Sequence, residues 1–477
     1  MAMTLCASSF GPILFLDDLR DGQTHLAALF LCQTGQAPAP VTVGDTRVTP
    51  QLLAQFDGHD LFRARFSVPA DRPSSYDWQG TRHDLAGLGG DVTLAYVSCN
   101  GEEHGDLDRD PAERNAMWGR LAERLTAQPV SLLLHGGDQI YADEVTQGHP
   151  LSQDWPERIP RDPSQADLAD LRAHLRARFL QRYMANYSDP RVAHVMARVP
   201  SLMQWDDHDI CDGWGSLKRS RTYSPVGQTL FQTAREMALL FQHATVDGDL
   251  PPRFADTLGF HLGWHVALPG LQLIAPDLRG ERTRREIMSA RAWQWVETLS
   301  RQPSPGRTLV LSSVPMLGPR LSLLELVMVL IPSMQKYEDD LRDQWQSRAH
   351  RDSWIHMLSL MLRIGTPKDQ QVTVLSGEIH LATRGEMTLN TGTTLHQLVS
   401  AGVAHRPPPR AWARFLGTLA GWGDAPLPGH PIRIRPLPGQ KHRYTDQRSV
   451  VLVSRSGADW QAQWLLEQDG LTPALPL

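Results

Sequence analysis

Several segments of the sequence place side chains that can bind metal ions directly after short apolar runs. The runs VTLAYV, SLLLH, SLMQW and QVTVL are followed by SCN, GGDQIYAD, DDHD and SGEIH. Each run has the length and composition of a buried strand. Ligands in open α/β sheets collect where the strands end, so these polar clusters could converge at one edge. The pattern therefore favours an enzyme with a metal centre.

The segment GGDQIYAD offers a carboxylate and a phenol three residues apart. One helical turn would direct Asp138 and Tyr141 toward the same ion. Asp138 could instead cap a helix, which is common for an aspartate after glycine. Cys99 adds a thiol at the preceding strand end, where a lone cysteine is often only a core residue. Phenolate and thiolate donors suit trivalent iron or a similarly acidic metal.

The densest acidic cluster is WDDHDICDGWG. It contains Asp206, Asp207, His208, Asp209 and Asp212 within seven residues. A calcium loop of the EF-hand type is excluded, because its third acidic position is Cys211 and the closing glutamate is missing. Repulsion among so many carboxylates is relieved best by a bound cation. We therefore expect this cluster to be part of the metal site.

Two further strand ends carry functional side chains. Glu378 and His380 alternate in SGEIH, so that an extended backbone directs both to one side as a mixed ligand pair. The segment DLRGERTRRE offers Asp277 as a candidate metal ligand. It also offers Arg279, whose guanidinium could hold phosphate oxygens.

Composition excludes several classes of function. A net charge of -5 gives no basic footprint for nucleic-acid binding. The four cysteines contain no CxxC spacing, which argues against a disulfide framework and structural zinc. The longest apolar run, at 321–332, is interrupted by Glu325 and is too short to cross a bilayer. Without a secretory or twin-arginine signal near the start, we expect a cytoplasmic protein.

A change in the pattern of predicted strands and helices near residue 88 indicates two domains. Residues 1–88 show short alternating strands between turns, which predicts a small β-sandwich of the fibronectin or immunoglobulin type. Residues 89–477 alternate strands and helices, which predicts an α/β (α+β) catalytic domain with a helical insertion around 320–366. The stretch HRPPPRAW at 405–412 is expected to be a surface loop without a functional role. No serine-hydrolase elbow, P-loop or dinucleotide fingerprint is present.

Taken together, SCN, GGDQIYAD, DDHD, DLRGERTR and SGEIH occur in the order seen in the bacterial alkaline phosphatase D family. This family is a branch of the calcineurin-like metallophosphoesterases, and the resemblance spans about residues 8–455. It implies a four-layer αββα core that holds two metal ions, preceded by a β-sandwich. It also implies an enzyme that hydrolyses phosphoric esters.

The resemblance implies a role for each matching residue. Cys99, Tyr141 and His380 would bind the first metal, Fe³⁺, and Asp138 would bridge both metals. Asp207 stands where most relatives have asparagine and would bind a second, divalent ion such as Ca²⁺, Mn²⁺, Zn²⁺ or Mg²⁺. His208 would assist catalysis without binding metal. Glu378 replaces the usual aspartate, and serines in RTLVLSSVP stand where many relatives keep a ligand histidine.

The expected reaction is in-line attack by a metal-bound hydroxide on a small phosphomonoester, as in an alkaline phosphatase. Arg279 and Asn100 would hold the phosphate oxygens. His208 would protonate or stabilise the leaving oxygen. Two alternatives remain open: a phosphodiesterase that uses the same two-metal site, and a metal-binding protein that has lost catalysis.

Overall fold

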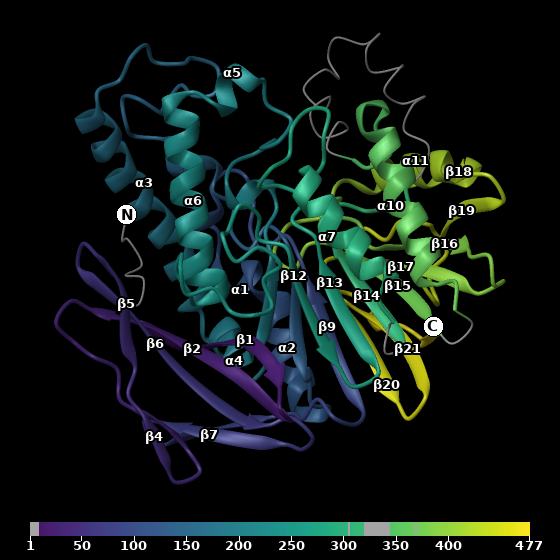
Figure 1. Ribbon diagram of the computed structural model, residues 1–477, viewed down its shortest axis with the longest axis horizontal. Helices are drawn as coiled ribbons and strands as arrows, with labels where there is room; N and C mark the ends of the chain where they lie inside the picture. Colours follow the sequence, from purple (N-terminus) through teal and green to yellow (C-terminus); the bar gives the residue numbers. More distant parts are fainter. Residues whose placement is uncertain (1–8, 304–305, 319–343, 368–369) are drawn as a thin grey trace.

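The computed structural model describes residues 9–303, 306–318, 344–367 and 370–477 of the chain. These residues form a mixed α/β structure, as expected from the sequence. Figure 1 shows two large sheets between two sets of helices. Half of the expected insertion at 320–366 lies outside the described residues, and its described half contains α10 (Arg351–Ile364).

The first sheet combines strands from the beginning, middle and end of the chain. Its order is β22-β21-β20-β9-β10-β11-β1-β2-β6-β5, with β23 paired to β21. Its parallel strands are β9 (Val92–Val97), β10 (Leu132–Gly136), β11 (Ser201–Gln204) and β1 (Phe10–Arg20). The others are β2 (Gln23–Gln33), β5 (Gln51–Phe56), β6 (His59–Pro69), β20 (Ser449–Ser456), β21 (Asp459–Leu466), β22 (Gly470–Leu471) and β23 (Leu475–Pro476).

The second sheet has the order β12-β13-β14-β15-β17-β16-β19-β18. Its parallel strands are β13 (Leu271–Ala275), β14 (Arg307–Ser312), β15 (Gln371–Ser376) and β17 (Thr394–Val399). The antiparallel ones are β12 (Trp264–Leu268), β16 (Thr383–Thr388), β18 (Asp424–Leu427) and β19 (His430–Arg435).

Alternating side chains in the second sheet connect two cores. Leu309 and Leu311 of β14 belong to the core shared with the first sheet, whereas Val310 between them belongs to a separate core. Successive side chains of a strand point to opposite faces, so the second sheet is covered on both sides. This arrangement requires apolar side chains at consecutive positions, which explains the continuous apolar runs of the sequence.

Helices cover the outer face of each sheet and complete the four layers (Figure 1). On the first sheet lie α1 (Pro111–Arg114), α2 (Ala116–Ala127), α3 (Gln165–Tyr187), α4 (Pro190–Met196) and α6 (Pro225–His243), with the short α5 (Arg219–Thr222) next to α6. On the second lie α7 (Ala290–Arg301), α10 and α11 (Arg410–Leu419). The expected αββα arrangement is therefore present.

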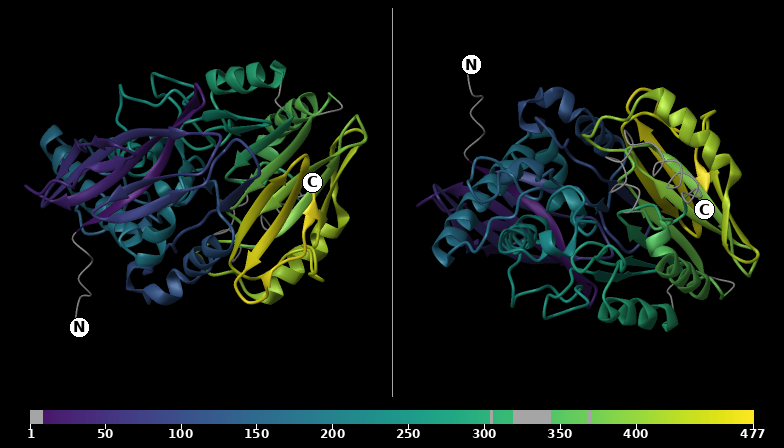
Figure 2. Two further views of the ribbon diagram at one scale, coloured as in Figure 1. Left: turned by 90° about the horizontal axis from the view of Figure 1, so that it is seen from below. Right: turned by 90° about the horizontal axis from the view of Figure 1, so that it is seen from above.

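The N-terminal strands do not form a self-contained sandwich. A small sheet of β3 (Val41–Val43), β4 (Thr46–Val48), β7 (Ser74–Trp78) and β8 (Thr81–Leu85) contacts β6, so two sheets do pack together there. However, β1 pairs in parallel with β11 through Phe15 and Ser201. Residue 88 therefore does not separate two sheets. Figure 2 shows these strands and the C-terminal strands at opposite ends of the molecule.

Within the described residues, every helix is too short or too polar to cross a membrane.

Candidate metal centre

Four of the expected metal ligands have a left-handed backbone conformation. Cys99, Asp138, Glu378 and His380 have φ angles of 55°, 56°, 64° and 54°. Cys99, Asp138 and Glu378 each lie two residues beyond a strand, after β9, β10 and β15 respectively. Residues other than glycine rarely adopt such angles, and strain of this kind concentrates at functional sites. Cys99 and Asp138 thus follow parallel strands of the first sheet, and Glu378 follows a parallel strand of the second.

Asp209 fixes the turn that carries Asp138. Its Oδ2 accepts hydrogen bonds from the backbone N–H groups of Asp138 and Asp206, both at 2.9 Å. Its Oδ1 accepts from Gln139 N at 2.9 Å and Ile140 N at 3.2 Å, and also from Gln242 Nε2 at 2.9 Å. Burial raises the pKa of Asp209 to about 7, although backbone hydrogen bonds oppose this effect. One carboxylate therefore joins the loops after β10 and β11.

Arg279 is fully buried and neutralises two neighbouring carboxylates. Its Nε donates to Asp206, and its Nη2 lies 3.3 Å from Asp207 Oδ1. Its Nη1 donates to the Trp214 carbonyl oxygen at 3.1 Å. Asp207 also accepts a hydrogen bond from Gly213 N at 2.9 Å. These contacts give Arg279 a role in orienting Asp207, which differs from the expected direct contact with phosphate.

His208 is oriented by Asp143 and stacks on Tyr141. Its Nδ1 lies 3.0 Å from both carboxylate oxygens of Asp143, and its ring centre lies 4.3 Å from that of Tyr141. Burial opposes the charged form, but Asp143 and Asp207 outweigh it and raise the pKa of His208 well above its usual value. A protonated imidazole in this position can donate a proton through Nε2.

Asp138, Asp207 and His208 form one group that fits a cation. Their potential ligand atoms all lie within 4.8 Å of one another. Asp138 Oδ1 is buried without a hydrogen-bond partner. Burial raises the pKa of Asp138 well above its usual range; His208 opposes this shift, whereas Asp206 and Asp207 add to it. Crowded, buried carboxylates with an unused oxygen are what a bound cation would stabilise.

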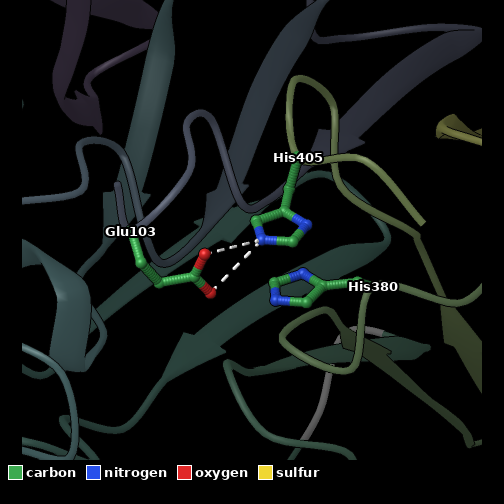
Figure 3. A group of neighbouring side chains, drawn as sticks. All are labelled: Glu103, His380 and His405. Carbon is green, nitrogen blue, oxygen red and sulfur yellow. Dashed lines mark hydrogen bonds and ion pairs between the residues drawn. The ribbon is translucent and has the colours of Figure 1, made fainter. Parts of the chain in front are cut away.

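A second group contains Glu103, His380 and His405 (Figure 3). The rings of His380 and His405 stack with centres 3.5 Å apart, and His405 Nε2 lies 3.3 Å from both oxygens of Glu103. His405 Nδ1 contacts the Arg406 carbonyl oxygen at 2.7 Å, a contact typical of metal-binding histidines. Two ligand atoms held about 2.1 Å from a tetrahedral ion lie about 3.4 Å apart, close to the Glu103–His405 distance.

Electrostatics within this second group also favour a cation. Burial lowers the pKa of His380 well below its usual value, and the charge of His405 adds to this effect. Burial opposes ionisation of Glu103, but the hydrogen bond and charge of His405 hold its pKa well below the usual range. His380 Nδ1 is buried without a hydrogen-bond partner. A neutral imidazole next to an ionised carboxylate is a suitable ligand pair.

Cys99 and Tyr141 are buried and Glu378 is half-buried, and none of the three belongs to either group among the described residues. Burial, followed by the charge of Asp138, raises the pKa of the Cys99 thiol well above its usual value. The Tyr141 hydroxyl is buried without a hydrogen-bond partner. Burial raises the pKa of Glu378 to about 8, although a 2.8 Å hydrogen bond from Gln344 opposes this. Such donors become strong ligands when a metal removes their protons.

Asn100 and Asp277 use their polar atoms for structural contacts. Asn100 Oδ1 accepts from Trp118 Nε1 at 2.8 Å, and its Nδ2 donates to the Gln139 carbonyl oxygen at 3.3 Å. Asp277 accepts four hydrogen bonds, from Trp205 Nε1, Leu262 N, Arg279 N and Gly280 N. These contacts favour a role for Asp277 in fixing the loop after β13.

Sequence reasoning missed Glu103 and His405. Glu103 lies in an acidic loop after SCN, and His405 begins the stretch that was expected to lack a function. The backbone explains their position, since the N–H groups of Ala404 and His405 both donate to the Cys99 carbonyl oxygen, at 3.2 and 3.1 Å. The available signal was a histidine two residues before a rigid proline run, which holds a loop in place.

Part of the chain is similar to a known family of phosphatases. Residues 114–336 match the family described as PhoD-related phosphatases. An uncharacterized protein of Saccharomyces cerevisiae is 26% identical over 351 residues, which cover 60% of this chain and 49% of that protein. The chain thus spans about half the length of this curated relative.

One solved structure shares the fold. The one described as the structure of PhoD superposes with a TM-score of 0.60 at 11% identity, covering 100% of this chain and 90% of that chain. GAP50, described as the anchor in the inner membrane complex of Plasmodium, gives a TM-score of 0.38 at 9% identity, covering 81% and 89%. The second similarity is too low to support an argument.

Proposed function

We propose that the chain is a PhoD-like enzyme, a metal-dependent hydrolase of small phosphomonoesters. The observation that carries this proposal is the group of Asp138, Asp207 and His208, with its unused buried carboxylate oxygen. No structural role of these side chains requires that oxygen. A cation that binds a phosphate oxygen would complete the site.

We assign the metal ligands to two positions. Cys99, Tyr141 and His380 would hold the first ion, which their donor types suit to Fe³⁺. Asp138 would bind both this ion and a second, divalent ion. Asp207 and Glu378 would be the other ligands of the divalent ion, with Glu378 coming from the end of β15. The contacts of Glu103 and His405 with His380 add these two side chains to the candidate ligands of the first ion.

Bound ions would acidify a water molecule and clamp the attacking and leaving oxygens of the phosphate. The protein side chains supply the remaining functions. His208 would donate a proton to the leaving oxygen, and Asp143 would keep its ring in the required orientation. Arg279 would act as a positioning residue, because it holds Asp207 and Asp206 by ion pairs. Asn100 Nδ2 donates one N–H to the Gln139 carbonyl oxygen, and its second N–H would contact a phosphate oxygen.

The experiment that tests this proposal compares Asp138→Asn with Asp84→Asn. Asp84 is a strand carboxylate whose side chain is 79% exposed, which makes it a suitable control. Metal content by elemental analysis and hydrolysis of p-nitrophenyl phosphate should both fall in Asp138→Asn and stay normal in Asp84→Asn. A fully active Asp138→Asn protein would refute the assignment.

The same preparation decides between monoesters and diesters. We expect p-nitrophenyl phosphate to be turned over faster than bis-p-nitrophenyl phosphate. The reverse order would identify a phosphodiesterase with the same ligands. A visible charge-transfer band would support ferric iron bound to Tyr141 or Cys99. A colourless protein that contains only zinc would contradict the iron assignment.

A further inference from the structure

An unusual group of exposed aromatic side chains lies on α11 and the short helix η6 (Ala420–Trp422). Trp412, Phe415 and Trp422 are 38%, 46% and 72% exposed. They account for three of the nine exposed large hydrophobic side chains among the described residues. The rings of Trp412 and Phe415 stack with centres 5.5 Å apart. We call these three residues the aromatic patch.

The helix α11 separates its side chains by type. Ala413 and Gly417 are buried against the second sheet's outer core. Trp412 and Phe415, three residues apart, share one side of the exposed surface. Arg410 and Arg414, four residues apart, share the other side. Such a division into aromatic and basic sides is typical of helices that lie in the surface of a membrane.

Two cavities next to α11 form one basic groove. The larger has a volume of about 680 Å³ and the smaller about 250 Å³. Arg443 lines both, and its Nη1 donates to the Gly417 carbonyl oxygen at 3.1 Å. A Cβ atom on Gly421 would meet the same Nη1 at 3.3 Å, so the glycine leaves room for this guanidinium. The groove therefore runs along α11 into η6.

The groove is strongly positive although the chain has a net charge of -5. Its charged lining contains the cations Arg351, Arg414, Arg433, Arg435, Lys441 and Arg443, but Asp424 as the single carboxylate. Arg435 pairs with Glu386 at 3.1 Å. By contrast, Arg414 and Arg433 form no ion pair with any other residue in the described part of the chain. Uncompensated cations concentrated at one place indicate an anionic partner.

We propose that the aromatic patch and the basic groove dock the protein on a membrane that contains anionic phospholipids. The cations would contact lipid phosphates, while the aromatic side chains enter the region between headgroups and acyl chains. A single-stranded nucleic acid is the main competitor, since it also combines charge with stacking. Trp422 lines the larger cavity, where a base could stack on it, but Trp412 and Phe415 line neither cavity. These two stacked rings therefore lie outside the path of a strand in the groove, which favours the membrane.

The test is cosedimentation of the full chain with vesicles of phosphatidylcholine, with and without phosphatidylserine. We expect binding only when phosphatidylserine is present, and weaker binding at high salt. Arg414→Glu/Arg433→Glu should weaken it by roughly thirtyfold or more, because each basic residue near an anionic surface contributes about a fivefold factor. Trp412→Ser/Phe415→Ser should weaken it by roughly tenfold. These readouts do not depend on hydrolysis.

A matched control removes two exposed hydrophobic side chains elsewhere. Leu258 and Phe260 are 71% and 58% exposed, and Arg291 lies over the Phe260 ring at 4.6 Å. Leu258→Ser/Phe260→Ser should bind vesicles like the unmodified protein, and circular dichroism should show that all variants are folded. The proposal is overturned if the unmodified chain does not bind phosphatidylserine vesicles, or if Leu258→Ser/Phe260→Ser loses binding as much as Trp412→Ser/Phe415→Ser does. Tight binding of single-stranded RNA without vesicle binding would assign the groove to nucleic acid instead.

Discussion

Replacing Asp209 with asparagine should weaken the hydrogen bonds that hold the backbone of Asp138 in the metal site. The Asp209 carboxylate accepts five hydrogen bonds, two at Oδ2 and three at Oδ1. In the less costly orientation, the new amide NH₂ faces the two backbone N–H groups of Asp138 and Asp206. Each buried donor that loses its acceptor costs about 1–3 kcal/mol, so we expect a loss of about 2–6 kcal/mol in unfolding free energy.

The loss should appear in two assays at about pH 8, where the carboxylate is ionised. Denaturant unfolding should shift to lower concentration, and metal content should fall because the backbone of Asp138 is no longer held. Asp256→Asn provides a control, since Asp256 also accepts backbone N–H groups, from Leu258 at 2.9 Å and Phe260 at 3.0 Å, outside the metal centre. It should lose stability without losing metal.

The reasoning fails if Asp209→Asn keeps its metal content and unfolds within about 1 kcal/mol of the unmodified protein. That result would mean that the five hydrogen bonds do not position Asp138. A loss of metal in Asp256→Asn as well would show that metal content reports general stability, and not the local geometry.

Three further predictions follow from individual contacts. His208→Ala should retain its metals and lose about 10²–10⁴ in kcat, measured with p-nitrophenyl phosphate; unchanged kcat would exclude proton transfer by this residue. Burial lowers the pKa of His135 to about 3, so the unfolded chain takes up the proton first and stability falls as pH drops below about 6.5. Between pH 6.5 and 4.5 the loss should be about 2.3 kcal/mol, and His135→Gln should remove that part of the slope in denaturant titrations at the two pH values. Gly136→Ala would place a Cβ atom 1.8 Å from the Tyr96 hydroxyl, so we expect a loss of solubility or a thermal midpoint several degrees lower, and a normal midpoint would contradict the packing.

The strand ends were predictable from the sequence because apolar runs and polar clusters alternate. Cys99, Asp138, Asp207 and His380 all lie where those runs predicted. The α/β class followed from the same pattern, and the four layers followed from the family resemblance. The backbone contacts of Cys99 could not be predicted, because the donors to its carbonyl oxygen lie in a loop more than 300 residues away.

Pairing between distant strands was the main source of error. Alternation in the N-terminal strands predicts which side chains are buried, but it does not predict the neighbouring strand. Nothing in the sequence therefore predicted the pairing of Phe15 with Ser201, which joins the N-terminal strands to β11 in one sheet. Glu103 and His405 were missed for the same reason, since loops without periodicity meet only in the folded chain.

The central claim is that hydrolysis depends on metals held by the strand-end side chains. Its most direct test is to remove the metals with a chelator, measure hydrolysis of p-nitrophenyl phosphate, and then add ions back while counting those bound per chain. We predict that activity is lost with the metals and returns as about two ions bind per chain. Full activity in a preparation freed of metal would contradict the account.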